Sequence, residues 1–213
     1  AVIPSWKIPS ALPIPTINYT TALDFDGAAN YVDAGITNYL NGVTQMSLSV
    51  WFNFDTAIST RGLIGDMQSI NYNFNNGHFH IVTKNASGND YSFRIYFIDT
   101  DSLQHSIDID NRPFTAGQWH NLVMTYNAGT VNFYVDGSLA PSTIFSGTIP
   151  TSFVTLTNNK PLEIGRWSTV EWDGLISNAQ IWTTELSSSD ALSIYNNGQP
   201  STTAFGSPVS WWK

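Results

Sequence analysis

The sequence predicts an all-β fold, a two-sheet antiparallel jelly-roll sandwich with one short helix near the C-terminus. Many short segments alternate apolar and polar residues and end in Gly, Asn or Asp turns, as where Val131, Phe133 and Val135 lead to Asp136-Gly137. Hydrophobic residues make up 42% and aromatic residues 14% of the chain, which is ample for a core, whereas charged residues make up only 11%. This composition is typical of an extracellular or particle-surface β-protein and excludes a disordered chain.

The two ends of the chain differ in composition from its middle. A length of 213 residues fits one β-sandwich, which we divide into a Pro-rich extended arm at 1–20, a jelly roll at 21–200 and a tail at 201–213. Four prolines exclude a helix or a central strand between Ala1 and Ile17: Pro4, Pro9, Pro13 and Pro15. The arm either wraps along its own domain or reaches a neighbouring subunit, and the sequence leaves both alternatives open.

Period-two alternation predicts roughly a dozen strands. One strand alternates Leu48, Val50, Phe52 and Phe54 with Ser47, Ser49, Trp51 and Asn53. Another alternates Tyr91, Phe93, Ile95 and Phe97 with Ser92, Arg94 and Tyr96. The last predicted strand follows the Asp173-Gly174 turn and places Leu175, Ser177, Ala179 and Ile181 on one face, with Ile176, Asn178, Gln180 and Trp182 on the other.

A helix is predicted directly after this strand. Ser187 and Asp190 have the spacing of a capping box, in which the Ser187 hydroxyl accepts the Asp190 amide and the Asp190 carboxylate reaches back. Ala191, Leu192 and Tyr195 then follow at helical spacing, and we expect Gly198 to cap the C-terminus.

Several of these segments resemble, in order, those of a laminin-G-like domain of the concanavalin A-like lectin/glucanase superfamily. The matching segments are Ala22–Gly27, Met46–Phe54, Trp119–Tyr126, Val131–Gly137 and Trp172–Gly198. The resemblance covers about Thr21 to Gly198 and implies the jelly-roll fold. It also implies a calcium ion that bridges the first and last strands, held here by Asp26, Gly27 and Asp173. The alternative is that both aspartates are ordinary turn residues.

Other acidic and histidine residues favour structural roles. Asp99, Asp101, Asp108 and Asp110 lack the spacing of a calcium loop and are interpreted as a solvated face. His78 and His80 share one face of a predicted strand, but no third metal ligand is indicated, and alternation around a buried Phe79 explains the pair.

The sequence also argues against several function classes. The glucanase relatives carry a Glu-x-Asp-x-x-Glu arrangement, whereas Glu163, Glu171 and Glu185 are far apart here, so we expect no enzyme activity. A net charge of −8 with eight scattered Lys and Arg residues argues against nucleic-acid binding. There is no Cys, and no apolar run approaches the roughly 18 residues that insertion into a membrane needs.

The leading hypothesis is therefore a non-catalytic recognition or adhesion module that binds carbohydrate, on an extracellular or viral particle surface. Aromatic rings would stack on sugars, and calcium would brace the loops. The expected binding residues are Tyr72 and Phe74 in an Asn-rich loop, Arg166 and Trp167 before the last strand, and Trp172. For each of these Trp residues a core position is the alternative, and Trp172 beside Asp173 can also be structural.

A second hypothesis is a structural or decoration protein of a virion or fibre. Its terminal arm and the pair Trp211-Trp212 would hold it to neighbouring subunits. Two adjacent Trp at a free end would expose much apolar surface. The tail therefore either packs on this domain, docks on a partner or marks a cut in a longer chain.

Overall fold

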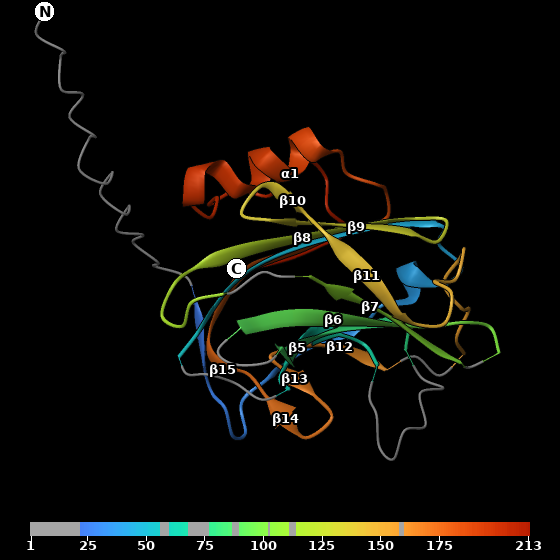
Figure 1. Ribbon diagram of the computed structural model, residues 1–213, viewed down its shortest axis with the longest axis horizontal. Helices are drawn as coiled ribbons and strands as arrows, with labels where there is room; N and C mark the ends of the chain where they lie inside the picture. Colours follow the sequence, from blue (N-terminus) through green and yellow to red (C-terminus); the bar gives the residue numbers. More distant parts are fainter. Residues whose placement is uncertain are drawn as a thin grey trace, which may run out of the picture.

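The computed structural model describes residues 22–55, 60–67, 77–86, 90–101, 103–110, 114–157 and 160–213. Within these residues the chain forms two seven-stranded antiparallel sheets that face each other, as predicted (Figure 1). The N-terminal arm and the loop with Tyr72 and Phe74 lie outside the described residues.

The first sheet holds the ends of the chain's β-structure together. In spatial order its strands are β1 (Leu23–Asp26), β15 (Asp173–Trp182), β3 (Gln45–Phe54), β8 (His120–Asn127), β9 (Thr130–Val135) and β10 (Ser138–Ala140), with β16 (Ser210–Trp212) paired to β15.

The second sheet runs from one edge strand, β11, to the other, β2. Its order is β11 (Ser142–Ser146), β7 (Gln104–Ile109), β6 (Asp90–Ile98), β5 (Phe79–Ala86), β4 (Gly62–Gly65), β12 (Pro161–Ile164) and β2 (Val32–Ile36). A separate hairpin, β13 (Arg166–Trp167) and β14 (Val170–Glu171), lies on the side of this sheet that faces away from the first (Figure 1).

The core fills the space between the sheets and is rich in aromatic rings. The Phe52 ring of β3 meets Phe93 of β6 edge-on, with ring centroids 5.0 Å apart and an interplanar angle of 87°. Trp172 approaches the same ring edge-on at 5.9 Å. Such edge-to-face pairs are favourable beyond the apolar area that they bury. The alternation predicted for the two long strands is therefore the pattern that faces the core.

The helix α1 (Ser188–Tyr195) covers the outer side of the first sheet (Figure 1). The predicted capping box is present, since Ser187 and Asp190 bond each other reciprocally. The predicted C-cap is wrong: α1 ends at Tyr195 and its C-cap is Asn196, which is left-handed (φ 46°), whereas Gly198 lies in the following 3₁₀ turn, η2 (Asn196–Gly198). Asn tolerates this conformation because its short amide bonds locally, as Asn196 does to the Gln199 carbonyl.

The faces predicted for β15 are wrong in one half of the strand. Asn178 has φ 49°, and the register against β3 shifts between Ser177 and Gln180. This irregularity puts Ile176 on the same core-facing side as Ala179 and Ile181. A bulge adds one residue to one strand and so reverses the parity beyond it. Period-two reasoning has no signal for such an insertion.

The tail packs on its own domain. β16 pairs with β15, and Trp212 packs against the main core. The Trp211 indole N–H donates to Asn178 Oδ1 at 2.6 Å. Of the three alternatives for the tail, the structure thus shows the first. No helix in the described part of the chain is long and apolar enough to cross a membrane.

Candidate functional site

The β13–β14 hairpin lies unusually close to the second sheet because of a glycine. A Cβ added to Gly62 on β4 would lie 2.1 Å from the carbonyl carbon of Arg166 and 2.1 Å from the backbone nitrogen of Trp167. Real Cβ atoms do not come so close to backbone, so only glycine allows this contact. The absence of a side chain on β4 therefore places Arg166 and Trp167 directly over the outer side of the sheet.

Trp167 forms a stack of rings on that side. Its ring lies 5.6 Å from the ring of Tyr96 on β6, with an interplanar angle of 17°. The ring of His80, which pairs with Tyr96 across β5 and β6, lies 6.3 Å from Trp167. Tyr96 and Trp167 are both half-buried. The Trp167 indole N–H is withdrawn from water and has no hydrogen-bond acceptor among the described residues. This buried donor is therefore out of reach of a ligand in the present arrangement, and the two rings can offer a ligand only the part of their surface that stays exposed.

An ion-paired group lies next to the rings. On neighbouring strands, Arg94 Nε and Nη2 donate to Asp108 Oδ1 and Oδ2 at 2.6 and 2.9 Å, and Lys84 also bonds Asp108 Oδ2. Burial alone raises the pKa of Asp108, but hydrogen bonds from Arg94 and Lys84 outweigh it and hold this pKa below its ordinary value. The Arg94 guanidinium lies 3.4 Å from the ring centroid of Phe145, which is 61% exposed.

The interpretation of the acidic cluster as a solvated face is therefore wrong for Asp108, which is only 5% exposed. Its charge is compensated by two cations, which makes its burial tolerable. Asp99 instead accepts from the Leu103 amide at 2.8 Å and from His105 at 2.7 Å.

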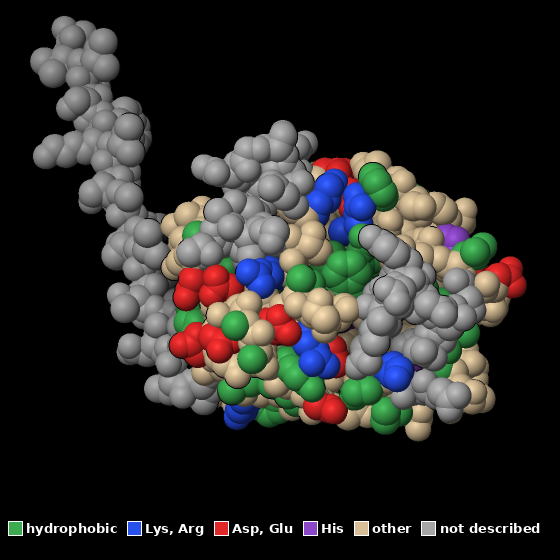
Figure 2. All heavy atoms as spheres, turned by 90° about the horizontal axis from the view of Figure 1, so that it is seen from below, with side chains coloured by type: hydrophobic (Ala, Val, Ile, Leu, Met, Phe, Trp, Pro, Cys, Tyr) green, Lys and Arg blue, Asp and Glu red, His purple; other side chains and the backbone are tan. Residues whose placement is uncertain are grey.

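Arg166 is held by two partners on the same side of the sheet. Its guanidinium bonds both carboxylate oxygens of Glu163 and lies 3.3 Å from the ring centroid of Tyr31. Figure 2, which looks onto this side, shows Lys and Arg side chains next to Asp and Glu, with hydrophobic side chains among them. We call the surface formed by Tyr96, Trp167, Arg94, Phe145 and Arg166, together with the buried carboxylates Asp108 and Glu163 that hold its two arginines, the aromatic face.

Trp172 does not belong to this face, contrary to prediction. It is fully buried, its indole N–H donates to the Asn53 carbonyl at 3.1 Å, and it meets Phe52 and Phe54 edge-on. A sugar ring needs an exposed aromatic surface, so this residue belongs to the core. Tyr72 and Phe74 lie outside the described residues.

The residues expected to hold calcium are close together, but their arrangement argues against the ion. Asp26 and Asp173 are direct partners in the β1–β15 register. Asp26 Oδ1 accepts the amides of Ala28 and Ala29 at 3.0 and 3.1 Å, and these bonds lower its pKa. It thus caps its own turn, the alternative interpretation of this residue.

The carbonyl of Gly27, the third expected ligand, is already engaged. Arg61 Nη1 donates to Gly27 O and to Glu171 O, both at 3.0 Å. Calcium prefers six to eight oxygen ligands, and here a fixed positive charge lies against one of them. Within the described ranges there is also no group of three or more His, Asp or Glu side chains that could hold a metal ion. The residues present therefore do not fit a calcium site that includes Gly27.

His78 and His80 are buried but do not form a pair. His78 Nδ1 lies 2.5 Å from Asp66 Oδ2, and His78 Nε2 lies 3.0 Å from Asn41 Oδ1. His80 lies under Trp167 instead. The shared face predicted for the two histidines is therefore wrong: His78 precedes β5 and stacks on Phe153, as Phe79 does, whereas His80 lies on the other side of the sheet.

The family follows from a comparison of sequence models. The model described as the concanavalin A-like lectin/glucanases superfamily, a laminin-G model, matches residues 26–192. The chain belongs to this family. The resemblance stated from the sequence motifs is thereby confirmed. No curated protein matches the chain.

Solved structures share the fold of this lectin/glucanase-family domain at low sequence identity. A heptameric SAP-like pentraxin from Limulus polyphemus is 12% identical over 90% of each chain, with a TM-score of 0.59. The CBM40 module of a Ruminococcus gnavus IT-sialidase, bound to α2,3-sialyllactose, is 13% identical over 82% of this chain and 98% of its own, with a TM-score of 0.57. A putative carbohydrate-binding protein from Bacteroides ovatus is 14% identical over 78% of this chain and 44% of its own, with a TM-score of 0.55.

The sequence pattern did not predict five members of the aromatic face of this family member: Tyr96, Arg94, Asp108, Phe145 and Glu163. A signal was present for two of them. Arg94 and Tyr96 alternate with the core residues of their strand, so they are expected on the face that points away from the core. Which residues of other strands lie beside them depends on sheet order, and the sequence does not contain that information locally.

Proposed function

We propose that this protein is a non-catalytic carbohydrate-recognition module that binds glycans on the aromatic face. The observation that carries the proposal is the stacked pair Tyr96 and Trp167, two half-buried rings on the outer side of the second sheet. The apolar face of a sugar ring packs on aromatic surface, and its hydroxyls take the polar groups around it.

The polar groups of the face are held in place before a ligand arrives. Asp108 is bonded by Arg94 and Lys84, and Glu163 by Arg166. Side chains that are already ordered lose little entropy on binding, which favours affinity. The Ruminococcus gnavus module is bound to sialyllactose, and it supports carbohydrate as the ligand class by likeness of fold.

The same contacts favour binding over hydrolysis. A glycosidase needs a carboxylic acid that stays protonated to donate to the leaving oxygen. The pKa of Asp108 is lowered by its cations, which is the opposite of that requirement. Both oxygens of Glu163 are bonded by Arg166. We therefore propose no catalytic role for this face. As a separate proposal, the protein works on an extracellular or virion surface.

A glycan array with wild type, Trp167→Ala and Trp167→Phe tests this function. Wild type is expected to bind a defined glycan set, Trp167→Ala to lose at least tenfold in affinity, and Trp167→Phe to keep most of it, because it retains a ring. Leu139→Ala, an exposed position on β10 of the other sheet, serves as the control for surface substitution. Thermal unfolding checks that each variant is folded.

Two outcomes would overturn the proposal at different levels. Equal binding by wild type and Trp167→Ala would remove the aromatic face as the site. Absence of binding by folded wild type to any glycan would remove carbohydrate recognition itself. Running the array with calcium and with chelator tests the ion separately, and we expect no difference.

The alternative function, a structural or decoration protein, rested on the N-terminal arm and on exposure of Trp211 and Trp212. Trp211 and Trp212 pack on their own domain in β16, and the arm lies outside the described residues. No observation in the described part of the chain favours this second function.

A further inference from the structure

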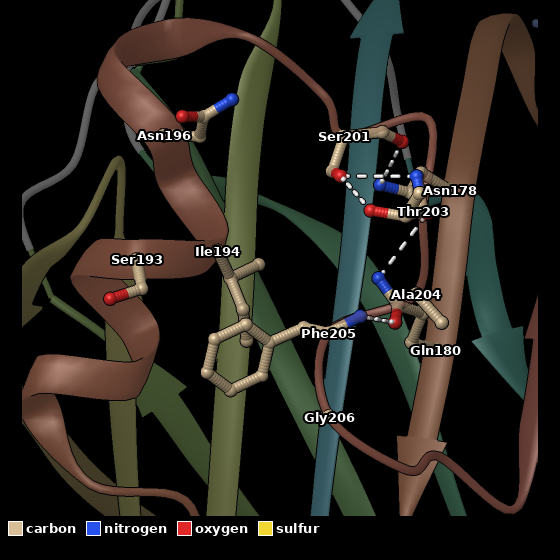
Figure 3. Close-up of a pocket in the computed structure, with 10 residues that line it drawn as sticks. All are labelled: Asn178, Gln180, Ser193, Ile194, Asn196, Ser201, Thr203, Ala204, Phe205 and Gly206. Atoms are coloured by element: carbon tan, nitrogen blue, oxygen red, sulfur yellow. Dashed lines mark hydrogen bonds between the residues drawn. The ribbon is translucent and has the colours of Figure 1, made fainter.

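A pocket lies on the opposite side of the molecule from the aromatic face. It has a volume of about 220 Å³ and is formed between α1, β15 and the loop that returns to β16 (Figure 3). The bulge in β15 places Asn178 and Gln180 in its wall. Ser193 and Ile194 of α1 lie across from them, and Phe205 of the returning loop lies between.

The polar wall is held by a hydrogen-bond network. Asn178 Oδ1 accepts from Gln180 Nε2 at 3.2 Å and from the Trp211 indole at 2.6 Å, and Asn178 Nδ2 donates to the Ser201 carbonyl at 3.3 Å. Gln180 Oε1 accepts the Phe205 amide at 2.8 Å. Both amide groups are therefore fixed in orientation. Each amide nitrogen carries two hydrogens and makes one of these bonds, so each retains a second N–H.

Hydroxyl groups complete the polar side. Ser201 Oγ and Thr203 Oγ1 are 3.1 Å apart, and Ser193 Oγ donates to the Ser189 carbonyl, which leaves its oxygen able to accept. None of the residues that line the pocket carries a charge. An ion would thus find no compensating partner, whereas a neutral molecule with several hydroxyls would find both donors and acceptors.

The remaining wall is apolar. The Phe205 ring is half-buried and meets Trp182 edge-on at 6.5 Å, and Ile194 lies beside it. The volume is below the range of about 300–1,000 Å³ that is usual for drug-sized ligands. One small ring, apolar on one face and polar at its edges, matches these dimensions and this chemistry.

We propose that this pocket binds one uncharged hydroxylated ring, such as a neutral monosaccharide or the neutral terminal unit of a glycan. This site is separate from the aromatic face. The proposal rests on the proposed function only in taking carbohydrate as the class of ligand. Because the two sites lie on opposite sheets, one molecule would hold two glycan chains at once, which raises avidity without new contacts.

The indole ¹H–¹⁵N NMR signals of the tryptophans report on the two sites independently. The Trp211 indole bonds Asn178, and the Trp182 indole donates to the Phe205 carbonyl at 3.1 Å, so both belong to the pocket network, whereas Trp167 belongs to the aromatic face. We would titrate the ¹⁵N-labelled protein with D-glucose, D-galactose and D-mannose, and with N-acetylneuraminic acid as the charged comparison. At least one neutral sugar is expected to shift the Trp211 and Trp182 signals saturably.

Two loop variants make the test specific. Thr203→Phe adds bulk at the pocket and is expected to abolish the shifts, while Thr202→Phe, its exposed neighbour outside the lining, is expected to leave them unchanged. Trp167→Ala is expected to leave the pocket shifts intact. The proposal is overturned if no neutral sugar produces saturable shifts, if only the acidic sugar does, or if Thr203→Phe binds as wild type does. If the titration shows no binding in the pocket but glycan-array binding still depends on Trp167, the proposed function remains supported and only the pocket proposal is rejected.

Discussion

At the scale of single residues, His80 shows how burial under the aromatic face changes an ionisable group. It is fully buried beneath Trp167, and burial lowers its pKa from 6.5 to about 4. The imidazole is therefore neutral in the folded protein at pH 7. A neutral ring can lie against Tyr96 and Trp167 without the cost of a desolvated charge.

We expect this histidine to reduce stability in mild acid. Between pH 6.5 and about 4 the unfolded chain binds a proton at His80 that the folded chain does not bind, so the free energy of unfolding falls as the pH falls through that window. The full effect is about 3 kcal/mol. Urea unfolding from pH 7.5 to 4.5 of wild type and His80→Leu, which cannot titrate, measures it. Parallel pH dependence of the two proteins would refute this explanation.

At the scale of elements, the hairpin β13–β14 and the strand β4 form one unit. Gly62 lets the hairpin backbone lie against β4, and Gly65 lets β4 lie against β5, where an added Cβ would be 2.5 Å from the His80 Cα. The position of Trp167 thus depends on two positions that have no side chain. The aromatic face is a product of this close packing rather than of a loop.

Gly62→Ala is expected to displace the hairpin. Its new methyl group would overlap the Arg166 and Trp167 backbone, and such overpacking typically costs about 1–3 kcal/mol. Because the displaced residues carry the proposed site, glycan affinity should fall as well. Denaturant unfolding and the glycan array together check this. Leu139→Ala, away from the hairpin, should change neither. Normal affinity in the alanine variant would show that the hairpin position is not critical.

At the scale of the whole molecule, the first and last parts of the jelly roll meet in one sheet. β1 pairs with β15, and Arg61, just before β4 of the other sheet, bonds the carbonyls of Gly27 and Glu171 that flank this pair. One guanidinium therefore ties together three distant parts of the sequence. It does so where the family resemblance implied an ion.

We expect Arg61 rather than calcium to stabilise this junction. Arg61→Gln removes the charge and leaves carbonyls without their donor, which should lower the free energy of unfolding by about 1–3 kcal/mol. Wild-type unfolding should be the same with calcium and with chelator. Lys84→Gln, which instead removes a cation that bonds Asp108, tests whether loss of any charge has the same effect. A large calcium-dependent stabilisation of wild type would refute this account.

The sequence determined much of the fold. Alternation placed Leu48, Val50, Phe52 and Phe54 in the core, and the Ser187–Asp190 spacing located the start of α1. These signals are local, because the period of a strand and the cap of a helix each depend on a few neighbouring residues. For the same reason the motif order was sufficient to identify the family.

Only the tertiary structure decided where the sites lie. Trp167 and Trp172 are five positions apart and look alike in sequence, yet one stacks on Tyr96 outside a sheet and the other is enclosed between the sheets. The bulge at Asn178, the contact of Gly62 with the hairpin and the reach of Arg61 to Gly27 all depend on which distant backbone lies alongside. Local periodicity fixes the direction of a side chain, but the neighbours it meets are set by sheet order and by the close packing of strands.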